Sequence, residues 1–259
     1  MMRWRMGRMD RSAYDRWFEL EDRHFWRVAK RELILELVER HRPAPAPGQP
    51  LRLLDIGGAC TLLTRELGRF GEITMVEHDE EMARFAAETL GLPVRQGSLP
   101  DRLPADLGGP FDVITLIDVL EHIDDDVAAA RAVLEILRPG GLAVISVPAV
   151  PLLWSEHDVS VHHRRRYMAR TLRPVLTAAG FAVERLTYHT SLLFPAVLAQ
   201  RLWSRLRRGL EARAEYPVHA PPAVLNRAFY AVMNLERRLL RRVDMPIGSS
   251  LVAICRRVA

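Results

Sequence analysis

The chain has 259 residues, of which 49% are hydrophobic and 27% are charged. This composition is ordinary for a globular protein and the length is enough for one large domain, so collagen-like, coiled-coil and wholly disordered chains are excluded. The two cysteines, Cys60 and Cys255, are too few for a disulfide framework or a cysteine-rich zinc site.

The net charge of +5 conceals an uneven distribution along the chain. Residues 1–50 carry 11 basic and 8 acidic side chains, residues 51–159 carry 8 and 19, and residues 160–259 carry 18 and 5. The basic C-terminal part is expected either to attract an anionic partner or to pair with the acidic middle.

Targeting signals are weak. The first ten residues are basic but lack the apolar core of a signal peptide, and the longest nonpolar stretch, 192–199, is too short to cross a bilayer. We therefore expect a cytoplasmic protein, either free or held at the inner face of the membrane.

Hydrophobic periodicity predicts a helix over residues 1–40, closed by the proline-rich linker 42–50. Buried strands and helices then alternate: the predicted strands are 51–56, 72–77, 92–96, 111–117 and 142–148, and the predicted helices are 61–70, 79–90 and 125–137. Strands that are buried on both faces and alternate with helices indicate a parallel sheet covered by helices on either side.

The pattern changes after residue 149. Residues 150–166 are expected to form a loop rich in histidine and arginine, before a helix over 168–179 and a strand over 181–188. Two basic amphipathic helices are predicted over 191–214 and 222–242, and a last strand over 250–258.

Two short motifs follow neighbouring strands of this pattern. Asp55 to Gly58, in LDIGGAC, lies where a buried strand gives way to a helix, and Glu77, in VEHD, closes the next strand 22 residues after Asp55. Glycines let the backbone approach a ligand closely, and an acidic strand end can accept hydrogen bonds from both hydroxyls of a ribose. Two ordinary strand-to-helix turns are the alternative, but the combination at one sheet edge favours a nucleotide-like ligand.

Longer motifs resemble the class I S-adenosylmethionine-dependent methyltransferases. The resemblance covers nearly the whole chain and is carried by LDIGGA (54–59), VEHD (76–79), FDVITLIDVLEHIDDD (111–126), LRPGG (137–141), VPAVPLLWSEHD (147–158), HRRRY (163–167) and PIGSSL (246–251). The WSEHD and HRRRY motifs are similar to those of a narrower bacterial subgroup. The resemblance implies a doubly wound, mostly parallel seven-stranded Rossmann-like sheet, with N-terminal helices and a helical insertion before the last strand.

The resemblance also implies which residues hold S-adenosyl-L-methionine. The turn after the first strand would face the methionine part, Glu77 would hold the ribose, and His78 would border the adenine. Ser98 and Leu99 would cover the purine, and Asp118 would lie beside the sulfonium. The full set of expected cofactor residues is Asp55, Gly57, Gly58, Ala59, Glu77, His78, Ser98, Leu99 and Asp118.

Three positions depart from the family pattern. The usual loop D-x-G-x-G-x-G has Ala59 and Thr61 in place of its second and third glycines, and Ser98 replaces the usual acidic residue after the third strand. Ala59 costs little if its φ is negative, and Thr61 fits if it begins the following helix as a cap. A nicotinamide cofactor fits less well, because GGAC lacks the G-x-G-x-x-G pattern that holds a pyrophosphate.

His122, in LEHIDDD, is the first candidate for the chemistry. It follows the fourth strand at the same edge as Asp55 and Glu77, and a histidine can take a proton from a weakly acidic acceptor near neutral pH. The alternative is a histidine that caps the next helix or bonds to the backbone. Glu121 is expected to be structural, with its carboxylate accepting bonds from loop N–H groups.

Further candidates occupy WSEHDVSVHHRRRY, after the fifth strand. His157, Asp158 and His163 are catalytic candidates. As a metal triad they lack a fourth ligand, so we expect a hydrogen-bonded His–Asp pair that orients a base or locks the loop, and no metal. The expected acceptor-binding residues are His24, Trp26, Trp154, Arg165, Arg166 and Tyr167.

Two helical segments have open alternatives. His24 and Trp26 either form part of a flap over the cofactor or anchor the N-terminal helix on the sheet. Residues 191–242 place leucine and tryptophan beside arginines. They suit peripheral contact with an anionic membrane, a roof over a hydrophobic acceptor, or a helical cap packed on the domain.

These observations together predict transfer of a methyl group from S-adenosyl-L-methionine to an oxygen or nitrogen of a small or lipid-linked metabolite. The alternatives are a methyltransferase-fold module that binds cofactor poorly, and a nucleic-acid methyltransferase that uses the basic C-terminal part. No RNA-binding module is recognisable, so no nucleic acid partner is expected. The expected division is a helical flap and linker (1–50), a cofactor-binding α/β core (51–190), a helical insertion or cap (191–247) and a final core strand (248–259).

Overall fold

The computed structural model describes residues 18–59, 61–207 and 221–258. Within them lies one seven-stranded sheet of order β3-β2-β1-β4-β5-β7-β6. The strands are β1 (Leu51–Ile56), β2 (Gly71–Glu77), β3 (Val94–Gln96), β4 (Phe111–Ile117), β5 (Leu137–Pro148), β6 (Phe181–His189) and β7 (Ser250–Arg257). Only β7 runs antiparallel to its neighbours. The predicted doubly wound, mostly parallel sheet is therefore confirmed.

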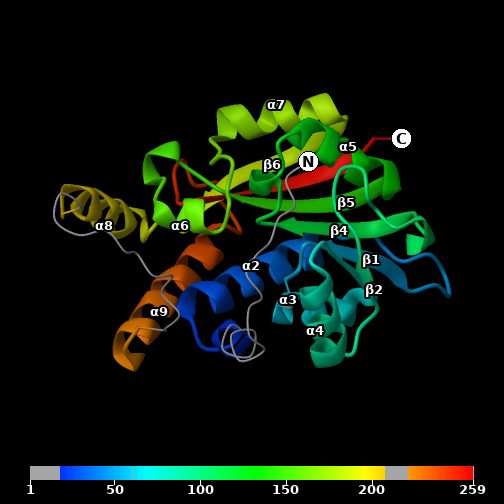
Figure 1. Cartoon of the computed structure of the whole chain (residues 1–259), viewed down its shortest axis with the longest axis horizontal. Helices are drawn as coiled ribbons and strands as arrows, with labels where there is room; N and C mark the ends of the chain where they lie inside the picture. Colours follow the sequence, from blue (N-terminus) through cyan, green and yellow to red (C-terminus); the bar gives the residue numbers. More distant parts are fainter. Residues whose placement is uncertain (1–17, 60, 208–220, 259) are drawn as a thin grey trace.

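Helices cover both faces of the sheet. The longer ones are α2 (Phe25–His41), α3 (Leu62–Leu67), α4 (Glu80–Leu90), α5 (Asp126–Ile136), α7 (Ala169–Ala179), α8 (Phe194–Arg207) and α9 (Ala223–Leu239). Figure 1 shows α5 and α7 on one side of the sheet and α2, α3 and α4 on the other.

The two cores follow from the alternation of side chains along each strand. On β4, Val113 packs into the core beneath α2, whereas its neighbour Ile114 packs into the core beneath α5 and α7. Strand β4 is buried on both faces, because helices cover both sides of a parallel sheet. Its carboxyl end is therefore held rigidly from above and below.

Helix α9 packs along α2, at the opposite end of the sequence (Figure 1). The Phe25 and Phe229 rings lie 5.1 Å apart, Tyr230 donates to the Glu32 carboxylate at 2.8 Å, and Arg237 pairs with Glu36. For residues 191–242 we considered membrane contact, a roof over the acceptor, and a helical cap packed on the domain. The contacts with α2 show that α9 is packed on the domain as a cap.

Some predicted boundaries were wrong. The stretch 150–166, expected to be a loop, contains the short helix α6 (Glu156–Ser160). The Ser155 and Asp158 side chains form a capping box at the N-terminus of this helix. Strand β5 begins at Leu137, before the Pro-Gly-Gly turn rather than after it. The beginning of the helix predicted over 1–40 and the end of the one predicted over 191–214 lie outside the described residues. None of the described helices combines the length and hydropathy that crossing a bilayer requires.

Candidate functional site

Three acidic residues stand at the carboxyl ends of neighbouring strands. Asp55 is the second-last residue of β1, Glu77 is the last residue of β2, and Asp118 directly follows β4. Strands β1 and β4 are the neighbours at which the chain changes its winding direction. In doubly wound sheets, ligands bind in the crevice outside the strands at this point.

Asp55 joins three elements beneath this rim. One carboxylate oxygen accepts from the Thr64 hydroxyl at 2.5 Å and the other accepts from the Thr115 hydroxyl at 2.6 Å. Burial raises the pKa of the Asp55 carboxyl despite these bonds. Asp55 therefore ties β1 to α3 and β4, and holds the turn that follows it.

The turn after β1, at Gly57 and Gly58, packs tightly against neighbouring side chains. Gly57 has a φ of +73°, and a Cβ atom there would lie 2.5 Å from a methyl group of Val119. A Cβ atom on Gly58 would lie 2.6 Å from the Asp55 carboxylate. Only glycine fits these two positions, so the turn at the sheet edge carries no side chain at either of them.

The two substitutions in the turn behave differently. Ala59 has a φ of +43°, so it occupies the left-handed region that disfavours a side chain. The sequence analysis expected little strain at Ala59 if its φ were negative, and the positive φ shows that this condition is not met. Thr61 has a φ of −96° and stands at the N-cap of α3, as expected, although its side chain makes no capping bond.

Glu77 faces the turn from the adjacent strand. One oxygen accepts from the backbone N–H groups of His78 (2.9 Å) and Asp79 (3.1 Å), and the other accepts from the N–H of Ala59 (3.2 Å). His78 Nδ1 lies 2.8 Å from the same carboxylate, and this hydrogen bond raises the pKa of His78. Glu77 thus links β2 to the Gly57–Ala59 turn, and its four contacts already use about as many acceptor sites as a carboxylate has.

Ser98 and Leu99 lie beyond β3. The backbone of Ser98 exchanges two hydrogen bonds with Arg102, at 3.0 and 2.9 Å, and Leu99 packs partly buried against the core. Their role over a purine stays a prediction.

Asp118 has an ion-pair partner that the sequence analysis missed. Lys30, from the middle of α2, pairs with its carboxylate and lies 4.9 Å from the centre of the Trp26 ring. Burial would raise the pKa of Asp118, but the Lys30 ammonium outweighs it and the pKa is lowered. A signal was available, since Lys30 is the only lysine among 37 basic residues.

His189, at the end of β6, is a second residue that the sequence analysis missed. It is buried, and one ring nitrogen lies 3.5 Å from the Ser146 hydroxyl. Burial and the Lys30 ammonium lower its pKa to about 3, so the ring is neutral near pH 7.

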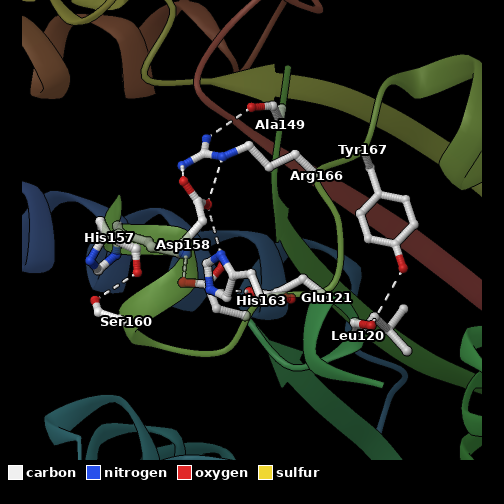
Figure 2. Close-up of polar contacts among 11 residues, drawn as sticks. Leu120, Glu121, Ala149, His157, Asp158, Ser160, His163, Arg166 and Tyr167 are labelled. Carbon is white, nitrogen blue, oxygen red and sulfur yellow. Dashed lines mark hydrogen bonds and ion pairs between the residues drawn. The ribbon is translucent and has the colours of Figure 1, made fainter. Parts of the chain in front are cut away.

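Asp158 is the centre of the second cluster of candidates (Figure 2). It accepts from Arg166 at 2.7 and 3.1 Å and from the Ser155 backbone N–H at 2.8 Å, and it bonds His163 Nδ1 at 2.8 Å. Burial would raise the pKa of Asp158, but the His163 and Arg166 bonds hold it well below its ordinary value. The expected His–Asp pair is present between Asp158 and His163.

Glu121 lies next to this pair and contradicts its expected role. Its side chain is fully buried, yet neither carboxylate oxygen has a hydrogen-bond partner among the described residues. The nearest cation-forming group is His163 Nε2, 3.8 Å from Oε1. Burial, and next the Asp118 charge, raise the pKa of Glu121 well above its ordinary value.

His122 and His157 flank His163. The ring centres of His122 and His163 are 4.8 Å apart, and those of His157 and His163 are 6.0 Å apart. His122 keeps one side open to solvent. Desolvation by the surrounding protein lowers the pKa of both His122 and His157 to about 4, so both are neutral acceptors near pH 7.

The expected acceptor-binding residues mostly have partners within the chain. Arg165 pairs with Asp126 at 3.0 Å, and the Tyr167 hydroxyl donates to the same carboxylate at 2.7 Å. Trp154 accepts from Arg205 of α8 through its backbone carbonyl at 3.0 Å. These contacts hold the loop, and the binding roles remain predictions.

At the start of α2, His24 has a structural contact as well. Its Nδ1 accepts from the Trp26 backbone N–H at 3.3 Å as the helix N-cap. Phe25 donates its backbone N–H to Asn226 of α9 at 3.0 Å. This contact supports the anchoring interpretation for the HFW segment, while Trp26 beside Lys30 stays close to the sheet rim.

The arrangement has two chemically different parts. A glycine turn and a buried carboxylate lie at the carboxyl ends of β1 and β2, and three histidines with two carboxylates lie beyond Asp118. Backbone N–H groups and carboxylates can hold a polar ligand, and a neutral histidine can accept a proton.

Comparisons with known proteins point to one family. A family model described as a methyltransferase domain matches residues 23–186. The ubiquinone biosynthesis O-methyltransferase of Cereibacter sphaeroides is 36% identical over 119 residues, which cover 44% of this chain and 48% of that protein. A Caulobacter protein of the same description is 34% identical and is covered to 48%. The chain thus spans about half the length of these curated relatives.

Solved structures share the fold. An S-adenosylmethionine-dependent methyltransferase from Mesorhizobium loti has a TM-score of 0.53 at 18% identity, with 87% of this chain and 98% of that chain covered. Because the sequence identity is low, this similarity supports the fold and says nothing about the activity of this chain. The family model covers more than half of the chain, and on that basis the protein belongs to the methyltransferase-domain family.

Proposed function

We propose that this protein transfers a methyl group from S-adenosyl-L-methionine to a hydroxyl oxygen of a lipid-linked small molecule. The observation that carries the proposal is at the sheet edge, where the glycine turn after β1 lies beside the Glu77 carboxylate at the end of β2, next to the winding reversal between β1 and β4. The choice of oxygen is supported by the curated relatives, which are named O-methyltransferases.

The glycine turn and Glu77 fit the cofactor. A side chain at Gly57 or Gly58 would collide with Val119 or Asp55, so internal packing requires glycine at both positions. Without side chains, the turn also lets a ligand come close to its backbone. Glu77 holds the two ribose hydroxyls, and Asp118 lies toward the sulfonium. When bound, S-adenosyl-L-methionine supplies a methyl group that is already activated for transfer.

The acceptor side must align a hydroxyl and take its proton. His122 is neutral near pH 7, open to solvent on one side, and four residues beyond Asp118. We assign removal of the hydroxyl proton to the histidine cluster that contains His122. The acceptor oxygen then becomes nucleophilic next to the methyl group of the cofactor.

A lipid-linked acceptor agrees with helix α8. Arg205 of this helix binds the Trp154 carbonyl, which brings α8 beside the histidine-rich loop. On the same helix Leu202 is 44% exposed and Trp203 is 57% exposed. Exposed apolar groups beside arginines are typical of helices that lie on an anionic membrane surface, where a lipid tail would be delivered.

The test uses tag-free full-length protein. Calorimetric titration with S-adenosylhomocysteine measures cofactor binding, and transfer of a labelled methyl group is then measured to a prenylated catechol in vesicles and to the same catechol without its tail. We expect cofactor binding, and a kcat/KM at least tenfold higher for the prenylated acceptor. Failure to bind S-adenosylhomocysteine at millimolar concentration would contradict the cofactor assignment.

Two variant pairs separate the parts of this proposal. His122→Ala should lower kcat by about 10²–10⁴-fold without changing S-adenosylhomocysteine affinity, whereas His162→Ala, at the exposed neighbouring histidine, should not. Leu202→Ser should weaken sedimentation with phosphatidylglycerol vesicles, whereas Val224→Ser, an exposed position on α9, serves as its control. Equal sedimentation of both variants would argue against membrane contact through α8.

A further inference from the structure

The Glu77 carboxylate is surrounded by donors from its own chain. Its Oε1 atom accepts from the backbone N–H groups of His78 and Asp79 at 2.9 and 3.1 Å, and it also lies 2.8 Å from His78 Nδ1. Its Oε2 atom accepts from the Ala59 backbone N–H at 3.2 Å. A carboxylate has about four acceptor sites, so these contacts leave no site for two ribose hydroxyls. For Glu77 to hold a ribose, one of its present partners must leave.

The His78 ring is the partner that can leave most easily. The N–H groups of His78 and Asp79 belong to the backbone between β2 and α4, and the Asp79 side chain accepts from the Met82 backbone N–H at 2.8 Å as the N-cap of this helix. Ala59 follows two glycines that neighbouring side chains hold in place. The His78 side chain is instead 65% exposed, so rotation about its own bonds frees Glu77 without moving the backbone.

The contact between His78 and Glu77 depends on pH. An ionised carboxylate only accepts hydrogen bonds, so Nδ1 of His78 carries a hydrogen atom whether the ring is neutral or charged. The bond to Glu77 favours the charged ring and raises the pKa of His78 above its ordinary value of 6.5. Desolvation by the surrounding protein opposes this shift without cancelling it. The contact is therefore strongest when the ring is protonated.

The other polar groups that face His78 either reinforce this effect or are uncharged near neutral pH. Asp79, in the same turn, carries a negative charge that also raises the pKa of His78. His122, after β4, is close enough for the two rings to repel each other when both are charged, but burial lowers its pKa to about 4. From β3, the Gln96 amide lies 3.5 Å from the His78 carbonyl and carries no charge. Glu77 thus has the largest influence on the titration of His78.

We propose that the His78 imidazole is a gate on Glu77, which occupies the place of a ribose hydroxyl and leaves when the adenosyl cofactor binds. The gate rests on the proposed function, since it takes Glu77 to be the group that holds the ribose. The sequence analysis expected His78 to border the adenine, and a ring released from Glu77 is free to take that position. His78 then sets the pH range of cofactor binding and takes no part in the methyl transfer itself.

The direction of the pH effect follows from the two positions of the ring. While it is bonded to Glu77, His78 has a raised pKa, and once released its pKa returns toward 6.5. Between these two values the ring is protonated before the cofactor binds and neutral afterwards, so binding releases up to one proton to the buffer. Cofactor affinity therefore rises with pH in this window, by up to about tenfold per pH unit. Below and above the window the titration of His78 has no effect on affinity.

Calorimetric titration of the full-length protein with S-adenosylhomocysteine tests the gate. Titrations near pH 7 in PIPES and in Tris, whose ionisation enthalpies differ, give the number of protons released, and titrations from about pH 5.5 to about pH 8.5 give the dependence of Kd. His78→Ala removes the ring, whereas His78→Asn keeps a hydrogen-bond donor at the place of Nδ1 but cannot take up a proton. His162→Ala, at an exposed histidine of another loop, is the matched control.

We expect the wild type and His162→Ala to release at least about 0.3 protons per ligand bound and to bind more tightly as the pH rises. His78→Ala should release none, and near pH 6 it should bind about threefold more tightly than the wild type, the size expected for one exposed charged contact. His78→Asn should also release none but bind less tightly than His78→Ala, because its amide still competes for Glu77. Thermal unfolding checks that each variant folds.

The outcomes distinguish failure of the gate from failure of the proposed function. Wild-type binding without proton release, or an unchanged pH dependence in His78→Ala, overturns the gate and leaves the proposed function standing. Equally tighter binding by His78→Ala and His162→Ala also overturns the gate, because the gain would not come from freeing Glu77. If neither the wild type nor His78→Ala binds S-adenosylhomocysteine at millimolar concentration, the proposed function fails and the gate fails with it.

Discussion

On the β1–β2 side of the sheet edge, where we propose that the cofactor binds, the buried carboxylates are satisfied from within the chain. Asp55 accepts from two hydroxyls and Glu77 accepts from three backbone N–H groups. On the side that follows β4 and β5, where we propose that the acceptor binds, Asp158 is equally well supplied, but Glu121 has no hydrogen-bond partner among the described residues. The two sides share one edge, yet only one of them leaves a buried carboxyl group without a partner.

This difference in hydrogen bonding indicates how each side of the site contributes to the stability of the folded chain. A site whose polar groups are already paired is preorganised, and a ligand adds donors to a fixed frame. A site with a buried polar group that lacks partners instead carries a desolvation cost in the folded chain, and burial shifts the pKa of that group toward its neutral form.

The largest expected effect contrasts the two acceptor-side carboxylates. Asp158→Asn leaves the buried Arg166 charge without its partner, so we expect the free energy of unfolding to fall by about 3–5 kcal/mol. Burial raises the pKa of Glu121 well above its ordinary value, so Glu121→Gln exchanges one neutral buried group for another of the same shape and should leave stability unchanged. Urea denaturation measures both, and equal losses in the two variants would refute the contrast.

A smaller effect is expected from the glycine turn. Gly57→Ala forces a side chain into Val119 at a φ of +73° and should lower stability by about 2–3 kcal/mol and S-adenosylhomocysteine affinity at least tenfold. Gly48→Ala is the matched control, since Gly48 has the same φ with nothing near its Cβ position. Similar affinities in the two variants would show that close approach does not matter.

Glu77 provides a test by binding. Glu77→Gln removes a charged acceptor from the rim, and the loss of about 1.5–3 kcal/mol predicts S-adenosylhomocysteine affinity about 10–100-fold weaker. Glu72→Gln, at an exposed position of the same strand, should bind as the wild type does. Calorimetric titration compares them, and unchanged affinity in Glu77→Gln would remove the ribose assignment.

The smallest effect concerns Ala59. Ala59→Gly relieves a φ of +43°, so we expect the free energy of unfolding to rise by about 1 kcal/mol with no loss of S-adenosylhomocysteine affinity. Ala83→Gly, inside helix α4, should instead lower it by about 1 kcal/mol. Thermal unfolding distinguishes the two signs. A destabilised Ala59→Gly would mean that the turn carries no strain there.

The cofactor side was predictable because its determinants are local. Apolar runs marked the strands, and Gly57, Gly58 and Glu77 came directly after two of them. Parallel strands bring such positions to one edge, so the spacing along the chain was enough to place them together. The backbone angle of Ala59 was not readable in this way, because it depends on the shape of the folded turn.

The acceptor side could be predicted only in part. A His–Asp pair was expected among His157, Asp158 and His163, and the fold pairs Asp158 with His163, whereas Glu121 was assigned to loop N–H groups that it does not bind. The loop after β5 folds back over the loop after β4, and the Arg164 backbone N–H donates to the Glu121 carbonyl at 2.7 Å. That contact joins segments more than forty residues apart, and no local pattern encodes it.

The sequence by itself determined the order of strands and helices and the polar groups at the strand ends, because side-chain periodicity and turn chemistry act between near neighbours. Only the tertiary structure decided which of those groups meet. Lys30 reaches Asp118 across 88 positions, and α9 lies on α2 with about two hundred residues between them. Such contacts depend on how the layers pack, and packing is a property of the whole chain.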